Sequence, residues 1–182
     1  MVAVFLASAG VGGATLDDLR TATQKIDAIQ SDRLNPGARV DLSVRELNAW
    51  VRSQAPAGVR DATLHIDSPG VATGAAMVDI AKVSRSQGFD PGWLIGKLLE
   101  GEHPVKVTAR IRSANGSATV DVDRVEVSGL EIDGKTLELL IQYVVLPLYP
   151  NAVVGRPFEL GHNIERFDVQ PAVVRVVIGP KR

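Results

Sequence analysis

The sequence predicts an α+β fold: a curved antiparallel sheet of hairpins packed on or around an apolar helix, with further helices at the N-terminal end. Three observations predict this class. Apolar residues recur at helical spacing in the first third of the chain, they alternate with polar residues in later segments joined by tight turns, and they gather on both sides of a helix within 133–148. Because hairpins join neighbouring strands, we expect antiparallel pairing throughout.

Composition limits the classes of function. A chain of 182 residues is long enough for one sizeable core, and we expect residues 15–182 to form a single domain. The net charge of −1 and the aromatic content of 4% argue against a nucleic-acid partner. The absence of cysteine excludes thiol catalysis, disulfides and cysteine-ligated metals. Composition leaves the oligomeric state open.

Residues 1–14 are apolar and then small, and Ala7-Ser8-Ala9 matches the small-x-small pattern of a signal-peptidase site. The basic region that usually precedes such a segment is missing. We expect a remnant of a signal peptide or membrane anchor; the alternative is a loose apolar terminus. The first interpretation predicts an exported protein, periplasmic or anchored in the envelope, that associates with the membrane only through this segment.

Two amphipathic helices are expected next. The first begins at Thr15 and is closed by Asn35-Pro36-Gly37, and its apolar face carries Leu19, Ala22, Ile26 and Ile29. The second begins at Val44, because Ser43 and Glu46 form a capping box and Leu42 and Leu47 have the spacing of a hydrophobic staple. It ends before Pro56, with Leu47, Trp50 and Val51 directed inward.

Three hairpins are expected, within residues 59–82, 105–127 and 164–178. In the second, Asn115-Gly116 is the sequence most typical of a type I′ turn. Counting from this turn places Ile111 opposite Val120, Ala109 opposite Val122, Arg110 opposite Asp121 and Thr108 opposite Asp123, with a bulge near Asp123 or Arg124. In the third hairpin, charge complementarity favours Asp168 beside Arg175.

Two further helices are expected, over 91–100 and within 133–148. The second is apolar on both sides, so it needs cover on both sides, either from the protein or from the protein and an apolar ligand. Small residues in the strand before Lys82 leave room for a close approach. A hydrophobic groove would be lined by Gly74, Ala76, Trp93, Leu94, Leu98, Leu137, Leu140, Ile141, Val144 and Leu148. Apolar stripes of this kind also form ordinary cores.

No motif for catalysis or for a metal is present. His65, His103 and His162 are isolated from other ligand types at metal-site spacing. Asp121 and Asp123 share one strand face, which favours a solvated surface over a cation site. No phosphate-binding loop and no G-x-S-x-G motif occurs. We therefore expect no catalytic residues, no cofactor and no metal.

Several short motifs resemble a family of bacterial cell-envelope proteins of unknown function. They are Pro36-Gly37, Glu46-Leu47-Asn48-Ala49-Trp50, Gly101-Glu102-His103-Pro104-Val105, Asn115-Gly116, Ile132-Asp133-Gly134 and Pro157-Phe158-Glu159-Leu160. The family is distantly similar to tubular lipid-binding domains, in which a curved sheet wraps an apolar helix and encloses an acyl-chain groove. The resemblance implies a secreted or single-pass protein with a lipid or fatty acid as possible partner. The leader here is shorter than the family's, and the central helix is shorter than a lipid tube requires.

Three functions follow as hypotheses. The first is a non-catalytic envelope protein that binds a lipid or other hydrophobic ligand in an apolar groove. The second is a structural or assembly module of the envelope with a solid core and no ligand. The third is a hydrolase, which would require a buried titratable cluster around a histidine.

Overall fold

A computed structural model describes residues 14–79, 82, 101–132, 134–140 and 154–181. The chain folds as α+β with antiparallel sheets, which confirms the predicted class. Among the described residues, no helix combines the length and the apolar character needed to cross a membrane. The elements are α1 (Leu16–Gln30), β1 (Arg39–Ser43), α2 (Val44–Ser53), β2 (Val59–Ser68), β3 (Val71–Asp79), β4 (Glu102–Ala114), β5 (Ser117–Val127), β6 (Leu130–Ile132), α5 (Gly134–Leu140), β7 (Phe158–Glu159), β8 (Ile164–Gln170) and β9 (Val173–Ile178).

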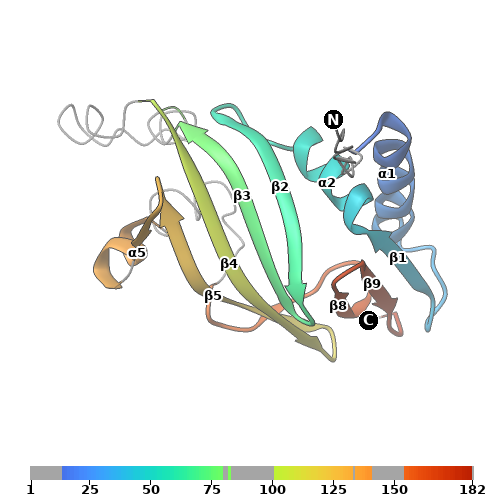
Figure 1. The fold of residues 1–182 in the computed structure, drawn as a ribbon. Helices are drawn as coiled ribbons and strands as arrows, with labels where there is room; N and C mark the ends of the chain where they lie inside the picture. Colours follow the sequence, from blue (N-terminus) through green and yellow to red (C-terminus); the bar gives the residue numbers. More distant parts are fainter. Residues whose placement is uncertain (1–13, 80–81, 83–100, 133, 141–153, 182) are drawn as a thin grey trace, which may run out of the picture.

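The strands form two sheets. A six-stranded sheet has the order β2-β3-β4-β5-β6, with the short β7 also paired to β5, and a three-stranded sheet has the order β1-β9-β8. Figure 1 shows β2 to β5 as long curved strands, with α1, α2 and the smaller sheet on the β2 side of them. The outermost strands β2 and β6 do not pair with each other, so the large sheet is open.

Helix α1 begins as predicted and ends earlier than predicted. Thr15 forms a capping box with Asp18, and Ala22 and Ile29 are buried on the apolar face. The helix stops at Gln30, where Ser31 caps it, and Asp32 follows with a φ of 54°. A left-handed residue just after a helix ends it, so the expected closure at Asn35-Pro36-Gly37 is wrong.

Helix α2 begins at Val44 behind the predicted capping box of Ser43 and Glu46. Ser43 is also the last residue of β1, a strand that the sequence did not predict. The residues expected to face inward, Leu47, Trp50 and Val51, are only half-buried, whereas Glu46 is 8% exposed. Burial of a carboxylate requires a partner, which α1 provides: Lys25 Nζ lies 2.7 and 2.9 Å from the two carboxylate oxygens of Glu46.

The hairpin registers were largely predictable. In the β4–β5 hairpin, Ile111 pairs with Val120, Ala109 with Val122 and Arg110 with Asp121, and the register shifts between Thr108 and Ala109. The predicted bulge is therefore confirmed. It leaves Thr108 opposite Arg124, and the expected pairing of Thr108 with Asp123 is wrong. In the β8–β9 hairpin, Asp168 pairs with Arg175 as expected.

Buried residues form two clusters. One lies between α1 and the three-stranded sheet and contains Ile29, Leu42, Val176 and Ile178. The other joins the two sheets and contains Ile66, Ala72 and Val169. Phe167 on β8 packs against both clusters. The small sheet therefore covers only the part of the large sheet that lies near its β2–β3 and β4–β5 turns.

Three residues at those two turns bind the outer edge of β8. Gly70 donates its N–H to Val169 O at 3.0 Å, and Gly116 donates its N–H to Glu165 O at 2.7 Å. Between them, the Ser113 hydroxyl accepts the N–H of Phe167 at 2.7 Å and donates to the Phe167 carbonyl at 3.1 Å. The two hairpin turns thus take the place of a neighbouring strand.

The free edge of β2 is covered by α2. The Asn48 side-chain amide accepts from Leu64 N–H at 2.7 Å and donates to Leu64 C=O at 2.8 Å, and Arg52 Nε donates to Ala62 O at 3.1 Å. Exposed strand edges pair readily with other chains. These side chains satisfy the edge over the stretch that faces the helix.

The prediction for the apolar helix is tested only in part. The described helix α5 runs over Gly134–Leu140, within the predicted segment. Residues 141–148 and the predicted helix over 91–100 lie outside the described residues. Residues 1–13, where the leader was expected, also lie outside them.

Candidate functional site

The large sheet has one continuous apolar face. Register partners in antiparallel strands share a face, and one row of such partners crosses five strands. This row runs from Leu64 on β2 through Gly74, Val107 and Val125 to Ile132 on β6. The next row, further from the β2–β3 turn, consists of Ala76, Val105, Val127 and Leu130. We call these two rows the apolar face.

The small sheet covers this face unevenly. Leu64 packs against the cluster that joins the sheets, but neither cluster of described residues includes Ala76, Val105 or Val127. A Cβ built on Gly74 would have only the carbonyl oxygen of Thr63, at 3.9 Å, within 4 Å among the described residues. Few described atoms therefore lie close to β3 at Gly74, although Val125 in the same row is only 5% exposed; Leu130 at the far edge is 70% exposed.

The structure therefore groups two of the predicted groove residues. Gly74 and Ala76 lie on the same face of β3, as the period of two required. Leu137 lies in α5 and is half-buried, and Leu140 is the last described residue of that helix. The remaining predicted groove residues lie outside the described part of the chain, so their contribution stays a prediction; they are Trp93, Leu94, Leu98, Ile141, Val144 and Leu148.

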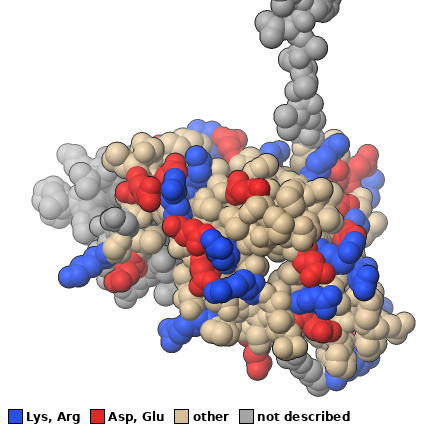
Figure 2. All heavy atoms as spheres, turned by 60° about the horizontal axis from the view of Figure 1, so that its bottom comes forward, with Lys and Arg blue, Asp and Glu red and all other residues tan. Residues whose placement is uncertain are grey.

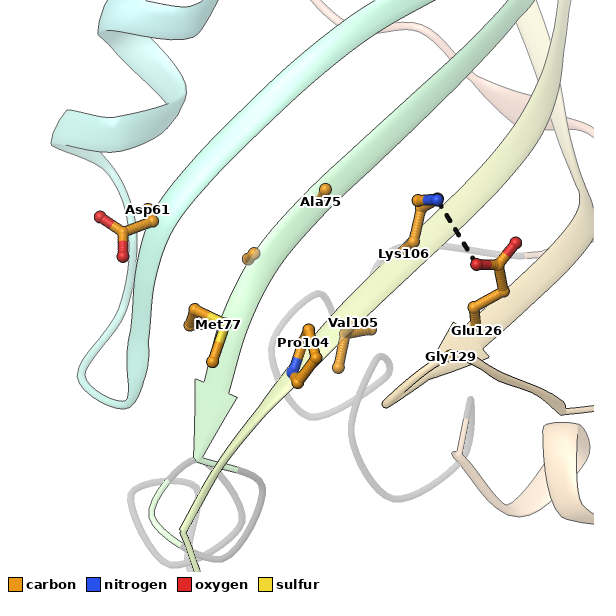
Figure 3. A pocket seen from close by; sticks show the side chains of 9 residues that line it. Asp61, Ala75, Met77, Pro104, Val105, Lys106, Glu126 and Gly129 are labelled. Carbon is orange, nitrogen blue, oxygen red and sulfur yellow. Dashed lines mark hydrogen bonds and ion pairs between the residues drawn. The ribbon is translucent and has the colours of Figure 1, made fainter.

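A shallow groove of about 350 Å³ lies on the opposite face of the same strands. Its apolar wall includes Ala75, Met77 and Pro104, and on one side Lys106 lies 3.4 Å from Glu126. Figure 3 shows Asp61 on the far side of the groove from the Lys106–Glu126 pair. One feature of the sequence indicates this groove: Ala75 and Met77 interrupt the polar residues expected at the odd-numbered positions of β3.

The charged side chains of the described surface are largely paired with one another. Figure 2 shows basic and acidic groups intermingled on one face of the molecule. On the outer side of the large sheet, Arg110 lies 3.1 Å from Asp123, and Arg60 binds both carboxylate oxygens of Glu102 at 2.7 and 2.6 Å. A hydrogen bond from Arg60 is the main cause that lowers the pKa of Glu102. Such pairing gives no extended basic surface for a polyanion.

A second hollow, of about 440 Å³, lies at the edge of β1 and includes three basic residues, Lys25, Arg39 and Arg175. Arg175 binds the Asp41 carboxylate with two bonds of 2.7 and 2.8 Å, and this contact is the main cause that lowers the pKa of Asp41. Lys25 binds Glu46 and also donates to the Asp41 carbonyl at 2.7 Å. Two of the three cations are therefore already neutralised by carboxylates of the fold.

Among the described residues, none of the three histidines belongs to a Ser–His–carboxylate arrangement. His65 is exposed and 3.9 Å from Asp67, and His162 lies 3.5 Å from Asp32 at the surface. His103 Nδ1 lies 3.2 Å from the Ser128 hydroxyl, but its Nε2 has no hydrogen-bond partner, so the carboxylate that would orient a Ser–His pair is missing from the described residues. Nor does the described part of the chain bring three His, Cys, Asp or Glu residues together as metal ligands.

The chain was compared with protein-family models, curated proteins and solved structures. These comparisons found no match. The resemblance to envelope proteins therefore rests on the short motifs alone, and the geometry of the sheet is the structural feature that bears on function.

Proposed function

We propose that the protein is a non-catalytic cell-envelope protein that binds the acyl chain of a lipid on the apolar face of its large sheet. The observation that carries the proposal is the row Leu64, Gly74, Val107, Val125 and Ile132, which is apolar on each of five adjacent strands. A sheet with one solvated face usually buries the other against the protein's own core.

The relief of this face favours a chain-shaped ligand. The side chains of β3 are small, at Gly74 and Ala76, while the neighbouring β4 contributes the larger Val105 and Val107, so the surface is lowest along β3. A methylene chain laid there gains about 0.8 kcal/mol for each CH₂ removed from water. Ten buried carbons would contribute roughly 8 kcal/mol before the costs of association are subtracted.

The location of the protein is part of the same proposal. The apolar segment 1–14 with its Ala7-Ser8-Ala9 pattern supports export to the envelope and contact with the membrane through that segment. A lipid-binding domain held close to a membrane would exchange its ligand with that membrane. No catalytic residue and no cofactor takes part in this function.

The test uses two neighbouring alanines that face opposite sides of β3. Ala76→Trp would fill the apolar face, whereas Ala75→Trp, the matched control, would fill the groove beside Lys106 and Glu126. We expect native mass spectrometry to show acyl-chain adducts on the wild type and on Ala75→Trp, and dodecanoic acid to raise the melting temperature of both. Ala76→Trp should show neither effect. A wild type without adduct or thermal shift, or loss of binding in Ala75→Trp alone, would refute the proposal.

A second candidate is a structural or assembly module of the envelope, which binds a protein instead of a lipid. Leu130 favours it, because a large apolar side chain that is 70% exposed on the edge strand β6 suits a protein contact. The same experiment separates the two candidates, since a module without a ligand would show no adduct and no thermal shift.

A further inference from the structure

His103 places a polar group at the margin of the apolar face. It lies near the start of β4 and pairs with Val78 of β3. Because side chains alternate along a strand, the imidazole belongs to the same face as Val105 and Val107. Its neighbour Glu102 belongs to the other face, where Arg60 binds it. The described residues around His103 on the apolar face are thus aliphatic, apart from Ser128.

One nitrogen of this imidazole lacks a hydrogen-bond partner in the part of the chain that the structure describes. Nδ1 lies 3.2 Å from the Ser128 hydroxyl, at the turn between β5 and β6, whereas Nε2 is buried and has no hydrogen-bond partner among the described residues. Buried polar atoms are nearly always paired, and a native exception is commonly explained by a group that the structure does not contain. If the Ser128 hydroxyl donates to Nδ1, the proton of the ring is on Nε2, which then donates to an acceptor.

We propose that His103 Nε2 binds the head group of the ligand, and that this ligand is a fatty acid whose carboxylate accepts the hydrogen bond from Nε2. This inference rests on the proposed function and gives the bound chain a direction. The carboxylate lies where β4 begins, beside the β5–β6 turn. The hydrocarbon extends from there over Ala76 and Gly74 toward the β2–β3 turn. A charged acceptor suits the site, because hydrogen bonds to ionised groups are about twice as strong as neutral ones.

The test compares two ligands with the same chain, dodecanoic acid and its methyl ester. In calorimetric titrations of the full chain, His103→Phe should weaken dodecanoate binding about tenfold, as expected for one lost charge-assisted hydrogen bond, and leave the ester unchanged. His103→Gln, which keeps an N–H donor, should retain most of the affinity for the acid. His65→Phe makes the same change at an exposed histidine of β2 and should alter neither ligand.

Circular dichroism of each variant shows whether it is folded, and the nitrogen resonance of His103 Nε2 gives a second signal, which should shift with dodecanoate and not with the ester. Equal loss of both ligands in His103→Phe, or wild-type affinity for the acid, would overturn the role of His103 while the lipid function stands. A wild type that binds neither ligand would overturn both.

Discussion

Replacing Glu46 by alanine should destabilise the fold more than replacing other surface carboxylates. Its carboxylate accepts two bonds from Lys25 and one of 2.7 Å from the Ser43 backbone N–H, and the residue is 8% exposed. Losing the Ser43 bond costs about 1 kcal/mol, and leaving the ammonium of Lys25 with the Asp41 carbonyl but without its carboxylate partner adds about 1–3 kcal/mol. We expect Glu46→Ala to lower the free energy of unfolding by about 2–4 kcal/mol.

Urea unfolding followed by circular dichroism measures this difference. Glu131→Ala is the matched control, because Glu131 is an exposed carboxylate 3.7 Å from Arg124. Exposed pairs of this kind contribute about 0–1 kcal/mol. If the two variants lose the same free energy within error, the partly buried pair of Lys25 and Glu46 is not what joins α1 to α2, and the reasoning fails.

The pH dependence gives a second measurement. Burial raises the pKa of Glu46, but the bonds from Lys25 and Ser43 outweigh it and hold that pKa below its usual range. On acidification the carboxylate of Glu46 is therefore protonated in the unfolded state before it is protonated in the folded state. The stability that ionised Glu46 contributes is complete above the unfolded pKa of about 4.3 and is lost as pH falls through the lower folded pKa. The stability gap between wild type and Glu46→Gln should shrink in that window; a gap that widens would contradict the sign.

Three further substitutions test the turns and the edge. Gly70 and Gly37 both have positive φ, so replacing either by alanine should cost roughly 1–2 kcal/mol of backbone strain. Gly70→Ala should cost more than Gly37→Ala in thermal unfolding, because only at Gly70 does the new Cβ meet a backbone oxygen, at 3.1 Å. Asn48→Ala should lower the free energy of unfolding by about 1–3 kcal/mol and promote aggregation, because it exposes the β2 edge at Leu64. Ser113→Ala should accelerate amide hydrogen exchange in β8 while the β4–β5 hairpin stays protected; unchanged exchange would mean that the hydroxyl does not hold the two sheets together.

The sequence was informative where structure is decided locally. The capping box at Ser43 predicted the start of α2, and Asn115-Gly116 predicted the register of the hairpin down to its bulge. Strand β1 was missed because its partner β9 lies at the other end of the chain, so no local turn marks the pair. Strands β6 and β7, of three and two residues, are too short to show a period.

In the candidate site too, features set by neighbouring residues were predictable from the sequence and features set by packing were not. Strand alternation was enough to place Gly74 and Ala76 on one face, because a period of two depends only on neighbouring residues. The groove beside Met77 and Pro104 also depends on the irregular pairing of β2, where Asp61 has a φ of 55°. The placement of His103, whose Nδ1 lies by Ser128 and whose Nε2 has no partner among the described residues, depends on how the β5–β6 turn lies against β4. The apolar Ala75 and Met77 are a sequence signal for the groove, but the position of His103 has no signature in the sequence.

The pairing of β1 with β9 also determines when the chain can finish folding. During synthesis α1, β1 and α2 emerge early, but the cluster that holds them needs Val176 and Ile178, which emerge among the last described residues. Contacts between distant segments slow folding, because a long loop must close before they form. Strands β2 to β6 of the large sheet pair in the order in which they occur in the chain, so they can assemble while the ribosome is still adding residues. Helix α1 must therefore remain without the apolar support of Val176 and Ile178 until β9 is released.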